Sequence, residues 1–107
     1  MSAITAGVHR GPVSATDLSG WRVAELTGGA TKAEVLSKIA EALEFPDWFG
    51  HNLDALWDCL TDLTEPTVLI WHGWENFAVQ QSRDWAALLR VLTERTGQRP
   101  DFALICA

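Results

Sequence analysis

Three short apolar segments, separated by amphipathic helical patterns, constrain the fold of this 107-residue chain more than any other feature. Residues 21–26, 67–72 and 102–106 have the length and composition of strands. The central segment is continuously apolar, as in a strand buried on both faces of a parallel sheet. Strands separated by helices are joined by right-handed crossovers. The pattern predicts an α/β domain with a small three-stranded, mostly parallel sheet packed against three or four helices.

Capping signals mark where the predicted helices begin and end. A Thr-x-x-Glu capping box at residues 31–34 starts the first helix, which ends before Pro46. Asn52 is a good N-cap for a second helix that runs to about residue 63. After a loop or short helical turn, Ser82 can cap a third helix.

The chain has the size of one globular domain that needs no disulfide or metal to hold its core. Residues 1–20 are rich in Gly, Ser, Ala and Thr and have no sustained periodicity, so we expect an N-terminal arm or extension there. The domain itself is then residues 21–107. The first residues also lack a basic start and a continuous apolar stretch, so we expect no signal peptide.

The second predicted helix carries a row of like charges. Asp54, Asp58 and Asp62 are four residues apart and, at about 100° per residue, lie opposite the apolar stripe. Each like-charged pair at this spacing destabilises a helix by roughly 0.2–0.5 kcal/mol, and no Lys or Arg occurs between Lys38 and Arg83. Folding gives no reason for such a row. A cationic partner does, and the net charge of −6 agrees with one.

Two other interpretations of the aspartates follow from the residues. A solvated acidic face is the ordinary role of a charged helix surface. Alternatively, Asp54 and Asp58 can serve as paired carboxylates for acid–base chemistry, or hold a divalent metal together with His51. A convex helix face lacks the enclosed site that catalysis needs, and the chain has no nucleophile elbow or phosphate loop. We therefore expect no enzymatic activity, no metal and no cofactor.

Aromatic residues flank the acidic row. Trp48 and Phe49 precede the helix, and we expect Phe49 to be mostly buried and Trp48 mostly presented to a partner. Gly50 beside them permits a close backbone approach or an unusual φ. Trp57 lies at the flank of the apolar stripe, where it can pack and also touch the edge of an interface. Trp71 is expected in the core.

Residues 45–61 read Phe-Pro-Asp-Trp-Phe-Gly-His-Asn-Leu-Asp-Ala-Leu-Trp-Asp-Cys-Leu-Thr. This run resembles the signature of the barstar family, intracellular inhibitors of barnase-type ribonucleases. The similarity extends more loosely from about residue 21 to residue 107. It implies a barstar-like fold and a protein whose acidic helix and preceding loop plug a basic ribonuclease active site, with carboxylates where RNA phosphates would lie.

The resemblance also implies roles for individual residues. Asp58 would insert deepest among the catalytic Arg and His side chains, Asp54 would be a second charged contact, and Trp48 would pack on a catalytic histidine. Glu94 would pair with a ribonuclease arginine, but pairing with Arg90 on its own helix is an equal alternative. The predicted partner-binding set is Asp58, Asp54, Trp48, Gly50, Asn52, Thr61, Trp57, Asp62 and Glu94.

The chain departs from the family pattern at the rim of this surface. Leu63 stands where the family has an interface tryptophan, Asp62 replaces a glycine, and Trp48 replaces a tyrosine. Cys59 keeps its family place, whereas Cys106 is new. These departures bear on which nuclease is cognate more than on the mode of inhibition.

The partner is thus expected to be a basic secreted ribonuclease bound one to one, with no direct binding of nucleic acid or membrane. We expect a monomer when free and a cytoplasmic location, with Cys59 and Cys106 reduced and buried. The alternative is an immunity protein or acidic adaptor for a different basic toxin or enzyme.

Overall fold

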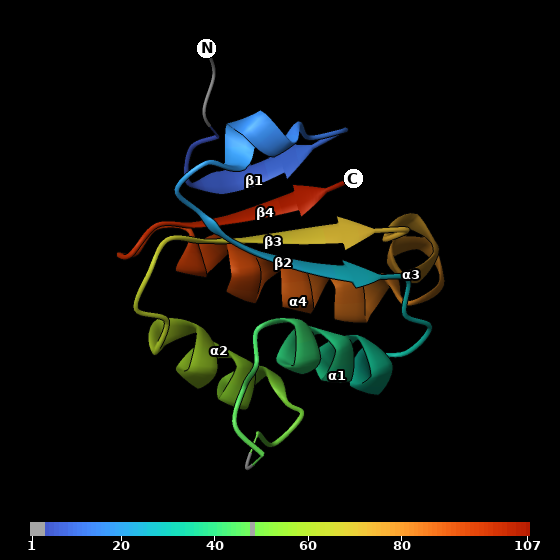
Figure 1. The fold of residues 1–107 in the computed structure, drawn as a ribbon. Coiled ribbons are helices and arrows are strands. Elements are labelled where there is room, and N and C mark those ends of the chain that lie inside the picture. Colours follow the sequence, from blue (N-terminus) through green and yellow to red (C-terminus); the bar gives the residue numbers. More distant parts are fainter. Residues whose placement is uncertain (1–3, 48) are drawn as a thin grey trace.

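A four-stranded, fully parallel sheet forms the centre of the structure, a computed structural model that describes residues 4–47 and 49–107 (Figure 1). The strand order is β1-β4-β3-β2. The two central strands, β3 and β4, are buried along almost their whole length, as expected for strands covered on both faces. The strands are β1 (Gly7–Arg10), β2 (Arg22–Thr27), β3 (Thr67–His72) and β4 (Phe102–Cys106).

Helices cover one face of this sheet, and Figure 1 shows α1, α2 and α4 on the same side of it. Their apolar stripes meet the inner face of the sheet in one main core, which includes Leu36, Leu56, Trp71 and Leu92. The predicted α/β class, with a parallel sheet packed against helices, is confirmed. The helices are α1 (Lys32–Ala42), α2 (Leu53–Thr61), α3 (Glu75–Gln80) and α4 (Ser82–Arg95).

The sheet has one strand more than the three that the sequence predicted. Residues 7–10, inside the segment assigned to the N-terminal arm, form β1 and pair in parallel with β4. Only alternate residues of this strand are half-buried, and the rest are exposed. Four residues with so weak a pattern give no strand signal. The free edge of β4, a tertiary feature, decides that this segment becomes a strand.

The N-terminal segment also covers the second face of the sheet. Half-buried apolar residues of this segment pack, together with Ala107, against a smaller core, and in Figure 1 the segment lies on the side opposite the helices. A short 3-10 helix, η1 (Ala15–Leu18), forms part of this cover. The smaller core consists of Val68, Ile70, Ala103 and Ile105.

The start of one helix differs from its predicted position. α4 begins at Ser82, but its N-cap is Gln81 and no side chain caps it, so the prediction of Ser82 as the cap is wrong. Gln81 also ends α3, and this close junction leaves Ser82 inside the first turn. By contrast, Thr31 caps α1 as predicted, with its hydroxyl accepting the Glu34 N–H at 3.2 Å. The described residues contain no helix that is both long and apolar enough to cross a membrane.

Trp71 is part of the main core, as predicted. Its side chain is fully buried, and its indole Nε1 donates to the Gly28 carbonyl at 2.9 Å. The ring packs against Phe77 and Trp85, and Trp85 stacks on Trp74. The buried indole is therefore both packed and hydrogen-bonded, which such a side chain requires.

Substitutions at two positions on the second face of the sheet, the face that the N-terminal segment covers, should differ in their effect on stability. Ile70 is 2% exposed, so Ile70→Ala should lower the free energy of unfolding by about 2–4 kcal/mol in urea melts. Val23 is 43% exposed, and Val23→Ala should change it by less than about 0.5 kcal/mol. Equal small losses at both positions would show that the N-terminal segment does not cover this face.

Candidate partner-binding surface

α2 has the amphipathic form that the sequence predicted. Leu56, Cys59 and Leu60 are buried on its inner side. Asp54 and Asp58 are exposed on the outer side, and the exposed Asp62 follows as the C-cap residue. The helix ends at Thr61, slightly earlier than expected. The three carboxylates therefore lie along one solvent-facing side of a helix whose other side is fixed in the core.

The turn before α2 is held by the side chain of Asn52. Its Oδ1 accepts the Ala55 N–H at 2.8 Å, which confirms the predicted N-cap, and its Nδ2 donates to the Gly50 carbonyl at 3.1 Å. A Cβ at position 50 would lie 3.1 Å from that Nδ2, which accounts for glycine there. The positive φ in this turn falls on His51, at 51°, and not on Gly50. The tight contact at Gly50 is thus with the Asn52 side chain, and the role of Gly50 toward a partner stays a prediction.

The aromatic residues before the helix are only partly described. Phe49 is 5% exposed, as predicted, and its ring lies 5.3 Å from the Phe45 ring and 5.0 Å from the His51 ring. Trp48, which we expect a partner to contact, lies outside the described residues. The buried Phe49 anchors the loop beside the N-terminus of α2.

A hollow of about 350 Å³ lies between α2 and α4. The structure brings Glu94 of α4 into the same hollow as Asp54 and Asp58 of α2. Among the ion pairs of the described residues, none joins Glu94 to Arg90, the alternative partner within its own helix. Apolar side chains complete the lining of this α2–α4 hollow: Leu53, Trp57 and Val91.

Trp57 and Thr61 occupy different places on this surface. Trp57 is half-buried and lines the α2–α4 hollow, so it both packs and faces the space between the helices. Thr61 is exposed, and its hydroxyl donates to the Asp58 carbonyl at 2.8 Å. The hydroxyl oxygen of Thr61 keeps its lone pairs for a partner's donor.

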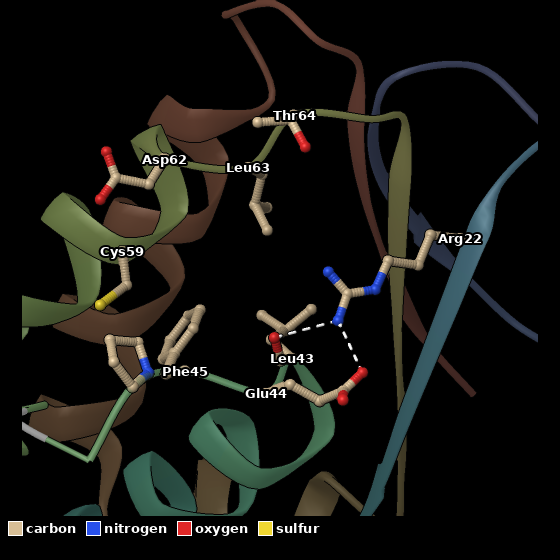
Figure 2. A pocket seen from close by; sticks show the side chains of 9 residues that line it. Arg22, Leu43, Glu44, Phe45, Cys59, Asp62, Leu63 and Thr64 are labelled. Atoms are coloured by element: carbon tan, nitrogen blue, oxygen red, sulfur yellow. Dashed lines mark hydrogen bonds and ion pairs between the residues drawn. The ribbon is translucent and has the colours of Figure 1, made fainter.

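A second hollow, of about 190 Å³, lies at the C-terminal end of α2, between that end and the segment after α1 (Figure 2). Asp62 and Leu63, two positions that depart from the family pattern, both line it. The guanidinium of Arg22 reaches in from β2, and its Nη2 donates to the Leu43 carbonyl and to Glu44 Oε1, both at 3.1 Å. No sequence pattern pointed to Arg22, because its pairing with the end of α1 spans 22 residues of chain.

The described residues contain no group of three or more His, Cys, Asp or Glu side chains arranged to hold a metal ion. Asp54 and Asp58 are exposed on a helix, and His51 lies in the preceding turn. His51 instead packs its ring against Phe49. The arrangement of these side chains suits contact with a large cationic surface better than coordination of one ion.

Both cysteines are buried and free. Burial raises the pKa of the Cys59 thiol, and the nearby Asp62 and Asp58 carboxylates raise it further. Burial is also the main reason that the pKa of Cys106 is raised. Because the thiol pKa is raised in the folded state, the protein keeps this full contribution to its stability below the ordinary thiol pKa of about 8.5. The contribution is lost as the pH rises from that value toward the folded-state pKa. The thiols are therefore packing groups at neutral pH, not nucleophiles.

Arg95 is a buried residue of this region that the sequence analysis missed. It is 0% exposed and lies on the buried stripe of α4, which otherwise carries Leu88 and Leu92. Its Nε donates to the Leu60 carbonyl at the C-terminal end of α2 at 2.8 Å. The available signal was its spacing, since Arg95 is three residues after Leu92 and seven after Leu88.

Comparison with known proteins agrees with the motif. A family model described as Barstar (barnase inhibitor) matches residues 21–105. The chain belongs to the barstar family. A curated relative from Bacillus subtilis (strain 168), named "Putative ribonuclease inhibitor YrdF", is 47% identical over 38 residues. That match covers 35% of this chain and 42% of the relative. It therefore spans less than half of the relative's length.

The Asn52 cap predicts a specific loss of stability. Asn52→Ala removes the acceptor for the Ala55 N–H and should lower the free energy of unfolding by about 1 kcal/mol in urea melts. Asn52→Ser keeps a capping oxygen and should lose much less. An alanine variant as stable as the serine variant would show that the cap does not hold this turn.

Proposed function

We propose that this protein inhibits a basic, barnase-type ribonuclease by covering its active site with α2 and the preceding loop. The observation that carries the proposal is the α2–α4 hollow, where Asp54, Asp58 and Glu94 surround an apolar lining. Membership of the barstar family and the name of the Bacillus relative support it. The protein would act in the cytoplasm as a free monomer that binds one nuclease, without a cofactor.

The charge distribution supports a cationic partner. None of the ion pairs among the described residues includes Asp54, Asp58 or Asp62, so the free helix bears their mutual repulsion. A ribonuclease active site must be basic because it binds the phosphates of RNA. Carboxylates placed among its Arg, Lys and His side chains replace phosphate oxygens, and Asp58, near the middle of the row, would insert deepest.

The α2–α4 hollow fits an arginine of the nuclease. The aliphatic stem and the planar guanidinium can pack against Trp57, and the carboxylates at the rim can accept its N–H groups. Glu94 would contribute from α4, so the partner would be held from both helices at once. Trp48, Gly50, Asn52 and Thr61 would form the rest of the contact surface along the loop and helix.

Electrostatic attraction would set the rate of association. A net charge of −6 and a row of exposed carboxylates steer a basic protein toward this face, and added salt weakens that attraction. The apolar lining and buried aromatic contacts would then set the rate of dissociation. Inhibition is therefore by steric block and phosphate mimicry.

A different basic toxin or enzyme is the second candidate partner. Asp62 and Leu63, which differ from the family pattern, line the second hollow beside the acidic row. A changed rim of this kind alters the choice of partner while the acidic centre is kept.

The function is tested by mixing the purified protein with barnase-type ribonucleases and following RNA cleavage. We expect stoichiometric loss of cleavage, with an association rate that falls as salt is raised. Absence of inhibition for every such enzyme, with the inhibitor in excess, would refute the first candidate. Binding to a basic toxin of another fold in the same assay format would support the second.

Asp58 should separate binding from folding. Asp58→Asn removes one member of the repulsive row, so the thermal midpoint should stay the same or rise slightly. The affinity for the nuclease should fall by at least about 2 kcal/mol, or roughly thirtyfold in Kd, as for a central interface residue.

The matched control is Glu41→Gln, which removes the same charge from an exposed position on α1. It should leave the affinity within about threefold, since a distant exposed charge contributes little. Unfolding of the Asp58→Asn variant, or equal binding by both variants, would contradict the proposed role of Asp58.

A further inference from the structure

Arg95 is the one charged side chain that is buried among residues 4–47 and 49–107. Removing a guanidinium from water is unfavourable by several kcal/mol, and burial accordingly lowers the pKa of Arg95. The charge of Asp101 partly opposes this lowering, but that carboxylate is ion-paired with Arg99 at 2.7 Å and not with Arg95. An apolar side chain of similar volume would fill this core position at lower cost, so packing alone does not explain an arginine there.

The contacts of Arg95 join three elements. Its Nε donates to the Leu60 carbonyl at 2.8 Å, and its Nη1 donates to the Gln98 carbonyl at 3.3 Å. Its guanidinium carbon lies 5.7 Å from the centre of the Phe102 ring in β4, whereas Nη2 has no hydrogen-bond partner among the described residues. The shortest bond is the one to α2, so the arginine mainly ties α4 to the end of α2.

The Leu60 carbonyl is one of the last in α2, where helix carbonyls lack partners within the helix. Two backbone N–H groups also donate to this carbonyl, that of Leu63 at 3.3 Å and that of the C-cap residue Asp62. Negative charge near a helix C-terminus is unfavourable, and Asp58 and Asp62 both lie in this last part of α2 or just after it. A cationic donor on the Leu60 carbonyl stabilises the helix end that bears them.

We propose that Arg95 is a positioning residue for the partner-binding surface, because it fixes the end of α2 relative to α4. Asp58 lies two residues before Leu60, and Glu94 directly precedes Arg95 in α4. The bond between Arg95 and Leu60 therefore fixes the relative position of carboxylates on opposite sides of the α2–α4 hollow. The effect on nuclease binding rests on the proposed function, whereas the anchoring of α2 does not.

The test uses the full chain with Arg95→Met, which keeps side-chain volume and removes the donors. Amide hydrogen exchange at Asp62 and Leu63 should become at least about tenfold faster, because the last turn of α2 loses its anchor. Dissociation of the nuclease should become at least about tenfold faster. The salt dependence of association should stay unchanged, since no exposed charge is removed, whereas Asp58→Asn should reduce it.

The matched control is Ile70→Ala, which removes buried contacts from the smaller core on the sheet face opposite α2 and α4. It lowers stability but leaves the α2–α4 contact and the donor to Leu60 in place, so at a temperature where it is fully folded its nuclease dissociation rate should match the wild type. Wild-type exchange and dissociation for Arg95→Met, or equal acceleration by Ile70→Ala, would overturn the positioning role.

Arg95→Lys is the second variant, for the case in which the methionine variant does not fold. Lysine keeps the charge but lacks the fixed fork that places Nε on the Leu60 carbonyl, so the same faster exchange and dissociation are expected. Unchanged rates would overturn the proposal. If the wild-type protein binds no ribonuclease, the proposed function fails, and the exchange measurements still decide whether Arg95 anchors α2.

Discussion

The contact between α2 and α4 is the interaction on which the rest of the surface depends. Leu56 and Leu60 of α2 join Leu88 and Leu92 of α4 in the main core. Burying a leucine side chain is favourable by about 1.5–3 kcal/mol, whereas each like-charged pair in the row is unfavourable by only 0.2–0.5 kcal/mol. The apolar side of α2 therefore outweighs the repulsion on its acidic side. The helix can present three carboxylates to solvent because the domain, not the helix alone, holds it folded.

The same contact explains how residues distant in the sequence act together. Asp54 and Asp58 are 40 and 36 residues from Glu94, and the packing of two helices brings all three to one hollow. Arg95 is a buried cation that none of the ion pairs among the described residues includes, and it is bonded to the end of α2. Stability and binding thus have different requirements here. The exposed acids oppose folding slightly and, in the proposed function, favour a basic partner. The buried arginine is unfavourable in the core and, as we propose, positions the acids.

The second face of the sheet shows a different dependence. β3 and β4 are apolar on both sides, so the helices alone would leave Ile70 and Ile105 exposed. The N-terminal segment covers them and adds β1 to the sheet edge. Because the family match begins at residue 21, this cover lies outside the matched region. It acts on the side of the sheet opposite the acidic helix, so we assign it a role in folding.

Local patterns were enough to predict the parallel strands 67–72 and 102–106, the Thr31 and Asn52 caps and the apolar and acidic sides of α2. Each of these depends on residues within one turn or one strand, where spacing alone fixes which side chains share a face. The fourth strand, the pairing of Arg22 with Glu44 and the bond from Arg95 to the end of α2 were not predictable in this way. They are fixed by a free strand edge, by a contact across 22 residues and by a helix end 35 residues away. Periodicity carries no information about contacts between residues so far apart in the sequence. The sequence by itself determined the acidic helix, and only the packing of α2 on α4 decided which groups surround it.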